Sequence, residues 1–377
     1  MIKKKTVAIF TAYTVPHLGG IERYVDNLVK QFVKMGITPV IITTNFDNSE
    51  YVLNNEGVTY YKLPIYSIFK HRYPIIKKNK EYRSIMAKLD GFSFDAIIVN
   101  TRFHLTSHIG ADYGFKRQIP VYLIEHGSNY VTLDNKFIDF FANRYEDFLT
   151  WKIKKKIKEF YGVSKACGEW LKKLGITYSG VWYNSIDCEQ CIPEKTKHNG
   201  VHYLYAGRII KQKGVENVLE AFKKMSTDYS DIELVVAGDG PELAKYKQKF
   251  NMTNIRFVGK LDYKHLVEQY ADADVFLYPP LWPEGLPTSI LEAGLFGCCV
   301  IGTNQGGIRE IVLDGENGMI VRNTEQALEQ GMREVYSNQE LREKYVNRMK
   351  KTIYSTFSWN VTARLVAKDI NVLKEDE

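Results

Sequence analysis

Residues 278–294 read YPPLWPEGLPTSILEAG, and this stretch decides the fold class. The three residues before it, 275–277, are apolar, as in the buried strands of a parallel sheet. Proline, tryptophan and glycine then interrupt the pattern. Pro287 suits the first position of a helix, so we expect a helix to begin near Leu286. The stretch predicts a strand, a loop and the N-terminus of a helix.

The predicted helix N-terminus is a candidate ligand site. Its free backbone N–H groups and the positive end of the helix dipole bind phosphate well. Glu284 would stand before the helix and Glu292 about a turn and a half inside it. A carboxylate only accepts hydrogen bonds, so it suits sugar hydroxyls better than phosphate. This favours a nucleotide-sugar site, although an amphipathic helix with two solvated glutamates would have the same pattern.

Length and composition limit the class of protein. A chain of 377 residues is long for one hydrophobic core and favours two domains. No apolar run approaches the roughly 18 residues that predict a membrane span. The basic and apolar start, residues 3–10, resembles a signal peptide but reaches Pro16 without a cleavage site of small residues. We therefore expect residues 7–11 to be the first strand of a cytoplasmic protein.

The charge is unevenly distributed. Residues 1–180 contain 27 Lys and Arg against 16 Asp and Glu, whereas the remainder has 24 against 28. Such a basic half favours an anionic partner, either a membrane or a nucleic acid. No nucleic-acid-binding module is recognisable. Residues 151–160 instead place lysines among apolar residues, which predicts peripheral contact with an anionic inner leaflet, with a solvated basic helix as the alternative. The lysines are Lys152, Lys154, Lys155, Lys156 and Lys158.

Apolar strands and helical segments alternate along both halves of the chain. This order is typical of parallel sheets with crossover helices, so we expect an α/β fold with two Rossmann-like, doubly wound domains. The predicted parts are a first domain at 1–184, a linker at 185–200, a second domain at 201–355 and a final helix within 356–377.

Seven short motifs carry a resemblance to a known family. In chain order they are Gly19-Gly20-Ile21-Glu22, Glu125-His126-Gly127, Gly162-Val163-Ser164, Ala206-Gly207-Arg208 with Lys213-Gly214, Ala237-Gly238-Asp239-Gly240-Pro241, Glu284 with Glu292, and Gly306-Gly307 with Glu310. Together they resemble the retaining GT-B glycosyltransferases of family four, which includes many bacterial polysaccharide and glycolipid assembly enzymes. The resemblance implies two domains facing a central cleft, the first for the acceptor and the second for the nucleotide sugar, with the final helix packed back on the first.

Two segments depart from the family pattern. Residues 183–185 read YNS where the family often has Pro-Asn-Gly. Residues 45–95, including FKHRY at 69–73, match no motif, and we expect this segment to face the acceptor.

The chemistry of transfer assigns roles to charged residues. Breaking the anomeric C–O bond leaves a diphosphate, on which negative charge develops. Arg208 and Lys213 suit this charge, because a guanidinium group is a fork of donors for phosphate oxygens and an ammonium group is a point charge. The resemblance implies that Glu284 contacts the donor sugar and Glu292 the ribose. It also places His126 near the reacting sugar, where we expect a hydrogen-bond donor.

Glycines allow the backbone to approach a diphosphate closely, because they carry no Cβ. We expect the N–H groups of Gly306 and Gly307 to contact the phosphate or the donor sugar. We expect Gly238 and Gly240 to lie beside the base and the ribose. The remaining predicted donor-binding residues are Gly19, Gly20, Gly207, Gly285, Leu286, Pro287 and Thr288.

No metal or other cofactor is expected. Asp272-Ala273-Asp274 spells an acidic D-x-D motif, but it directly precedes a buried strand rather than following one. His104 and His108 could share a helix face, yet no third ligand is evident. Cys188 and Cys191 form a single C-x-x-C without a partner pair, which favours reduced thiols.

The sequence therefore predicts a retaining glycosyltransferase that moves a sugar from a nucleotide-diphosphate sugar, with UDP preferred on prevalence alone. The expected acceptor is a glycan or lipid-linked glycan of cell-surface polysaccharide assembly. The alternatives are a nucleotide-sugar epimerase or phosphorylase of the same architecture, and a non-catalytic subunit that binds a nucleotide sugar.

Overall fold

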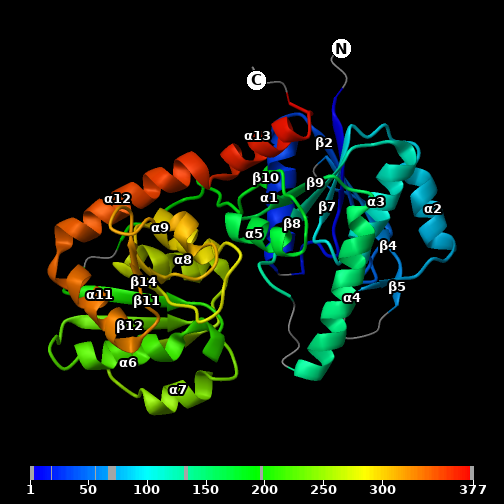
Figure 1. Ribbon diagram of the computed structural model, residues 1–377. Coiled ribbons are helices and arrows are strands. Elements are labelled where there is room, and N and C mark those ends of the chain that lie inside the picture. The colour runs from blue at the N-terminus through cyan, green and yellow to red at the C-terminus, as the bar shows by residue number, and fades with distance from the viewer. Residues whose placement is uncertain are drawn as a thin grey trace. The chain divides into compact units, whose positions relative to one another are not determined.

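The computed structural model describes residues 4–17, 19–55, 57–66, 74–130, 135–195 and 198–373. The chain forms two compact units, each an α/β layer structure around its own sheet (Figure 1). The first unit comprises Met1–Asn184 with Trp359–Glu377, and the second comprises Ser185–Ser358. The unassigned segment at 69–73 lies outside the described residues.

The first unit contains an eight-stranded sheet in the order β10-β9-β8-β7-β1-β2-β4-β3. All neighbouring strands run parallel except β3 and β4. The strands are β1 (Thr6–Phe10), β2 (Thr38–Thr44), β3 (Val52–Asn55), β4 (Val58–Leu63), β7 (Ala96–Asn100), β8 (Val121–Glu125), β9 (Glu159–Gly162) and β10 (Gly180–Val181). Beside this sheet, β5 (Ile65–Tyr66) and β6 (Ile75–Ile76) form a separate antiparallel pair.

Both faces of this sheet are buried, because the central strands are apolar at every position. Val7 and Ile9 face one hydrophobic core, whereas Ala8 and Phe10 face the other. The first core includes side chains of α1 and α13, and the second includes side chains of α2 to α5. The helices are α1 (Gly20–Lys34), α2 (Lys80–Leu89), α3 (Leu105–Arg117), α4 (Lys136–Lys154), α5 (Lys165–Lys173) and α13 (Trp359–Asp369).

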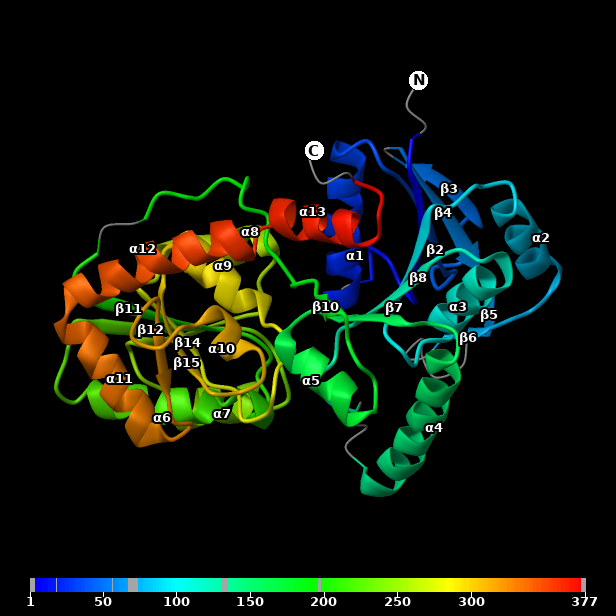
Figure 2. The ribbon, with the colours of Figure 1, turned by 45° about the horizontal axis from the view of Figure 1, so that its top comes forward.

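The last helix, α13, belongs to the first unit and lies against α1 (Figure 2). The ring of Trp359, which is 2% exposed, meets the ring of Tyr24 at a centroid distance of 4.9 Å. The indole N–H of Trp182 donates to Asp369 at 2.7 Å. The chain therefore returns to its first unit through aromatic packing and a hydrogen bond.

The second unit contains a six-stranded parallel sheet in the order β13-β12-β11-β14-β15-β16. Its strands are β11 (Val201–Ala206), β12 (Ile232–Ala237), β13 (Ile255–Gly259), β14 (Val275–Tyr278), β15 (Cys299–Thr303) and β16 (Met319–Val321). Its α-helices are α6 (Val215–Met225), α7 (Leu243–Lys249), α8 (Tyr263–Asp272), α9 (Thr288–Phe296), α10 (Ile308–Ile311), α11 (Glu325–Ser337) and α12 (Gln339–Thr356).

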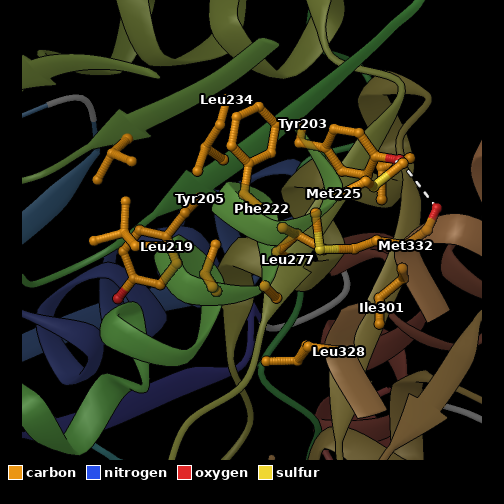
Figure 3. Packing of buried hydrophobic residues seen from close by; sticks show 14 of the residues in the cluster. Tyr203, Tyr205, Leu219, Phe222, Met225, Leu234, Leu277, Ile301, Leu328 and Met332 are labelled. Carbon is orange, nitrogen blue, oxygen red and sulfur yellow. Dashed lines mark hydrogen bonds between the residues drawn. The ribbon is translucent and has the colours of Figure 1, made fainter. Parts of the chain in front are cut away.

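Tyr203 lies in the core of the second unit (Figure 3). Its ring packs against Phe222 at a centroid distance of 6.0 Å, and its hydroxyl donates to the carbonyl oxygen of Met332 at 3.0 Å. A buried tyrosine thus contributes apolar area while its polar end is satisfied. This contact ties β11 to α11 across the core.

Two predicted boundaries differ from the structure. Helix α9 begins at Thr288, and Pro287 is its extended N-cap rather than its first helical residue. The predicted final helix starts three residues later than 356, because α12 ends at Thr356 and α13 begins at Trp359. Among the described residues no helix is both long and apolar enough to cross a membrane.

Candidate active site

Each sheet has one point where the strand order reverses. In the first unit, β1 leads to β2 on one side and pairs with β7 on the other. In the second unit, β11 likewise lies between β12 and β14. The loops that leave the carboxyl ends of two such strands diverge, and ligands of α/β proteins bind in the crevice between them. The predicted site residues follow these strands.

Lys213 and Glu284 meet at the switch point of the second unit. Lys213 ends a short 3₁₀ turn after β11, and Glu284 lies in the loop after β14. Their Nζ and Oε1 atoms are 2.6 Å apart, and Nζ also lies 3.3 Å from the hydroxyl oxygen of Tyr278. Burial lowers the pKa of Lys213, but Tyr278 and Glu284 outweigh this and raise it above its usual value. Lys213 is therefore a fixed cation.

Arg208 differs from Lys213 in its environment. It follows β11 directly, and its side chain is exposed. Its carbonyl oxygen accepts a hydrogen bond from the hydroxyl of Tyr205 at 3.2 Å, which anchors the backbone of the loop. The guanidinium group is thus exposed on the same loop as Lys213, just after the carboxyl end of β11.

Glycines let the loops of this site pack against one another. At Gly306, with a φ of 56°, a Cβ would lie 1.9 Å from the carbonyl oxygen of Glu284. The N–H of Gly307 donates to that same oxygen at 3.0 Å. This bond serves loop-to-loop contact, and the expected contact of Gly307 with phosphate or donor sugar stays a prediction. Gly214 has the same function, because a Cβ there would lie 1.9 Å from the carbonyl oxygen of Pro279.

Other predicted glycines also bond within the protein. The N–H of Gly207 donates to the carbonyl oxygen of Ala237 at 3.0 Å, and that of Gly238 donates to Gly259 at 2.8 Å. The N–H of Gly240 donates to the Asp239 carboxylate at 2.7 Å. The first bond joins the loop after β11 to the end of β12, the second joins the loop after β12 to the end of β13, and the third lies within the loop after β12.

The N-terminus of α9 completes this group of loops. Gly285, Leu286, Pro287 and Thr288 lead into the helix, with Leu286 and Pro287 buried. Glu292 follows four residues after the first helical residue and is 8% exposed. The Tyr270 hydroxyl donates to its Oε2 at 3.1 Å. Glu292 is thus a buried acceptor held from α8.

In the first unit the loop after β1 contains Gly19 and Gly20. Gly19 is the N-cap of α1, and a Cβ at Gly20 would meet no atom of the described residues within 4 Å. The adjoining Glu22 is buried, and its Oε1 lies 3.1 Å from Nδ1 of His17. This loop therefore places a histidine–carboxylate pair at the mouth of the first switch point.

His126 follows β8 and is half-buried. Loss of hydration lowers the pKa of His126 to about 4, although the negative charge of Glu125 acts to raise it. The imidazole of His126 is therefore neutral at pH 7. Nε2 lies 3.0 Å from Oδ1 of Asn100. The Asn100 amide donates its Nδ2–H to Phe10, which orients Oδ1 toward the histidine. In this arrangement Nε2 carries the proton, and Nδ1 is an acceptor.

A buried ion network supports the His126 loop. Arg102 is fully buried and donates to Glu125 at 2.9 Å and to Glu146 at 2.8 Å. The other oxygen of Glu125 accepts the N–H groups of His126 and Gly127 at 3.2 and 3.1 Å. Sequence reasoning missed Arg102 and Glu146. The available signal was an arginine two residues after a buried strand, beside a strand that ends in glutamate.

The acidic D-x-D motif lies at the other end of its sheet. Asp272 and Asp274 precede β14, and Asp274 Oδ1 lies 2.5 Å from Lys195. His198, His202 and Asp272 have ligand atoms within 4.8 Å of one another and could hold a metal ion. His202 is the second residue of β11, so this cluster is at the amino ends of the strands and away from Lys213.

His104 and His108, which were considered as metal ligands from the sequence, have structural positions at the start of α3. His104 is its N-cap, and His108 is 7% exposed with Nε2 3.1 Å from the carbonyl oxygen of Arg102. Among the described residues, all five cysteines, including Cys188 and Cys191, are free.

Comparison with known proteins agrees with this architecture. A family model described as Glycosyltransferase Family 4 matches residues 18–190, and one described as Glycosyl transferases group 1 matches residues 192–352. An uncharacterized glycosyltransferase of Methanocaldococcus jannaschii is 27% identical, covering 96% of this chain and 97% of its own.

Solved structures share the fold. Sucrose-phosphate synthase of Thermosynechococcus elongatus has a TM-score of 0.78 at 16% identity, covering 98% of each chain. HepE of Anabaena, solved with UDP and glucose, has a TM-score of 0.71 at 14% identity, covering 98% of this chain and 100% of its own. The two parallel sheets and these likenesses define an α/β protein of the GT-B fold.

The chain belongs to family four of the glycosyltransferases, a retaining family. It is a glycosyltransferase, an enzyme that transfers a sugar to an acceptor.

Proposed function

We propose that the donor is a UDP-linked sugar and that it binds at the switch point of the second unit. The observation that carries this proposal is the pairing of Lys213 with Glu284 at 2.6 Å, between the loops that follow β11 and β14. A diphosphate needs cations, and a sugar needs acceptors for its hydroxyl groups. This pair offers both beside the N-terminus of α9, which adds N–H groups and a positive dipole end. The UDP bound to HepE of Anabaena supports the choice of nucleotide.

The proposed reaction breaks the bond between the anomeric carbon and the diphosphate oxygen. The acceptor hydroxyl oxygen forms the new bond on the same face, and its proton passes to the leaving diphosphate. Lys213 and Arg208 stabilise the charge that develops on the leaving group. Glu284 accepts from the sugar hydroxyls, and Glu292 accepts from the ribose.

His126 has a related role in the proposal. Its neutral ring presents Nδ1 as an acceptor because Nε2–H is directed to Asn100. We assign Nδ1 to a hydroxyl of the reacting sugar. The expected acceptor substrate is a glycan or lipid-linked glycan of cell-surface polysaccharide assembly, met at the inner face of the cell membrane, and residues 1–184 are assigned to its binding.

A thermal-shift panel of UDP, GDP, ADP and their common sugar conjugates tests the donor assignment. A ligand that binds only the folded protein raises the melting temperature by mass action. We expect UDP and one UDP-sugar to raise it, and Lys213→Ala to reduce the shift. The exposed Lys247 of α7 offers a matched control as Lys247→Ala. A shift with another nucleotide, or with none, would contradict the UDP assignment.

The product separates this function from its alternatives. Incubation with the stabilising UDP-sugar and a glycan acceptor should give a new glycoside with retained anomeric configuration, detected by NMR spectroscopy. Free epimerised sugar would indicate an epimerase. Binding without transfer or slow donor hydrolysis would indicate a non-catalytic subunit.

A further inference from the structure

Helix α4 presents an aromatic face to solvent. Its nineteen residues, Lys136–Lys154, extend from the body of the first unit (Figures 1 and 2). The exposed fractions are 74% for Phe137, 59% for Phe140, 55% for Phe141, 54% for Phe148 and 56% for Trp151. Scattered exposed apolar residues are ordinary, but five large rings on one helix form a continuous apolar surface of the kind that marks an interaction site.

The spacing places these rings on one side of the helix. Phe137, Phe141, Phe148 and Trp151 follow intervals of three, four or seven residues, which align on one face. The opposite face holds the buried residues Glu146, Leu149, Thr150 and Ile153, which anchor the C-terminal half of the helix to the unit. The solvent face is therefore apolar where a surface helix is normally polar.

Positive charge accompanies the rings. Arg144, Lys152 and Lys155 are exposed, and Lys155 Nζ lies 3.3 Å from the centroid of the Trp151 ring. Of the acidic residues in the same turns, Glu146 is buried, whereas Asp147 accepts from Tyr130 and pairs with Arg144 at 3.3 Å. The net positive charge of this face therefore comes from Lys152 and Lys155. Among the predicted membrane-facing lysines, Lys156 pairs with Asp112, whereas Lys152 and Lys158 are exposed.

We propose that this face of α4 docks on an anionic lipid bilayer, with its rings at the boundary between headgroups and acyl chains. Aromatic residues and lysines on one exposed helix face are the composition of interfacial helices, in which apolar burial and attraction to anionic lipids add. A second copy of the chain is a less suitable occupant, because its helix would bring Lys152 and Lys155 toward the same charges. The proposal deepens the proposed function by naming the surface at which a lipid-linked acceptor is met.

Docking on this face would also act on the candidate active site. Glu146 of α4 bonds to Arg102, Arg102 bonds to Glu125, and Glu125 accepts the N–H groups of the His126 loop. These contacts lie within one unit, and their charged groups are buried. The helix and the loop therefore form one rigid part of the first unit, so an anchored α4 holds the loop at a constant height above the membrane.

Vesicle flotation of the full chain tests the proposal. We expect the protein to float with phosphatidylcholine vesicles that contain phosphatidylglycerol, less so at high salt, and poorly with phosphatidylcholine alone. The double variant Phe137→Ser with Phe141→Ser should lower the partition coefficient at least about tenfold. Phe115→Ser is the matched control, because Phe115 is a 62% exposed phenylalanine on α3 of the same unit.

Three measurements keep the outcomes distinct. Melting temperatures should match wild type, since the substituted rings are exposed. Equal flotation of the double variant and wild type, or no flotation with anionic vesicles, would overturn the proposal. A dimer that sedimentation shows in wild type but not in the double variant, without vesicle binding, would assign the face to a second copy. The UDP-sugar thermal shift should persist in the double variant, so failure of docking is distinguishable from failure of the donor assignment.

Discussion

Lys213 Nζ lies 2.6 Å from Glu284 Oε1, across the point where the strand order of the second sheet reverses. One residue follows β11 and the other follows β14, so the pair exists only because these two strands are neighbours. Each side chain is about one-fifth to one-quarter exposed, which leaves both accessible to a ligand. The pair holds a cation and an acceptor at fixed positions before donor binds.

Loss of this cation should reduce turnover. We expect Lys213→Ala to lower kcat/KM by roughly 10²–10³-fold, because a positive charge on the leaving diphosphate matters most as the bond breaks. Steady-state kinetics with the stabilising UDP-sugar measures this. Lys247→Ala should behave as wild type. An effect of Lys213→Ala as small as that of Lys247→Ala would mean that Lys213 does not belong to the site.

Arg208→Ala should lower kcat more than it raises KM. The guanidinium group is exposed, so it gives up few contacts with the protein when it moves toward the leaving group. Its interaction with that group strengthens as negative charge develops there. A variant with a raised KM and unchanged kcat would instead assign Arg208 to uniform donor binding. Melting temperature should be unaffected, since the side chain is exposed.

Glu292→Ala should weaken donor binding and also destabilise the fold. Its removal leaves the buried Tyr270 hydroxyl without this acceptor, at a cost of roughly 1–3 kcal/mol. Tyr270→Phe separates the two effects, because it removes the hydroxyl while retaining the carboxylate. Isothermal titration with UDP should show weaker binding for Glu292→Ala than for Tyr270→Phe. Equal affinity in the two variants would contradict the ribose assignment.

The Arg102 network should be essential for the stability of the first unit. Arg102→Met would leave Glu125 and Glu146 buried without their cation, which we expect to cost about 3–5 kcal/mol. Arg117→Met is the comparison, since Arg117 forms an exposed pair with Asp90 and should cost under about 1 kcal/mol. Urea denaturation measures both. Similar losses in the two variants would mean that the network is not a major source of stability.

Three histidines with lowered pKa values should make the first unit sensitive to acid. Loss of hydration lowers the pKa of His104, His108 and His126 to about 4 each. Between pH 6.5 and 4 the unfolded chain binds protons that the folded chain does not, so unfolding becomes more favourable as the pH falls. The stabilisation from the neutral histidines is fully present above about pH 6.5. On acidification, protonation of each histidine should lower the free energy of unfolding by roughly 1–3 kcal/mol.

Melting temperatures across this pH range test that expectation. His108→Leu should flatten the dependence, because His108 is buried with a single backbone carbonyl as its hydrogen-bond partner and can be replaced by an apolar residue. His265, which is exposed on α8 of the second unit, is the control as His265→Gln. A pH dependence that His108→Leu leaves unchanged would contradict the assignment of acid sensitivity to this site.

Local patterns in the sequence determined the two-sheet α/β fold and its principal loops. Apolar runs mark strands that are buried on both faces, and polar or glycine residues directly after them mark carboxyl ends, where ligands bind. His126 directly follows such a strand, and Lys213 and Glu284 lie in the loops that follow two others. The aromatic spacing of α4 was also readable, since helical periodicity is a local property.

Tertiary structure alone decided which of these residues touch. Glu125 and Glu146 are separated by 23 and 44 positions from Arg102, and only the pairing of β7 with β8 and the packing of α4 bring them together. The bond from Gly307 to Glu284 and the proton position on His126 likewise depend on neighbours from other strands. The physical reason is that periodicity records what each segment buries, whereas hydrogen-bond partners and protonation depend on groups that are distant in the chain.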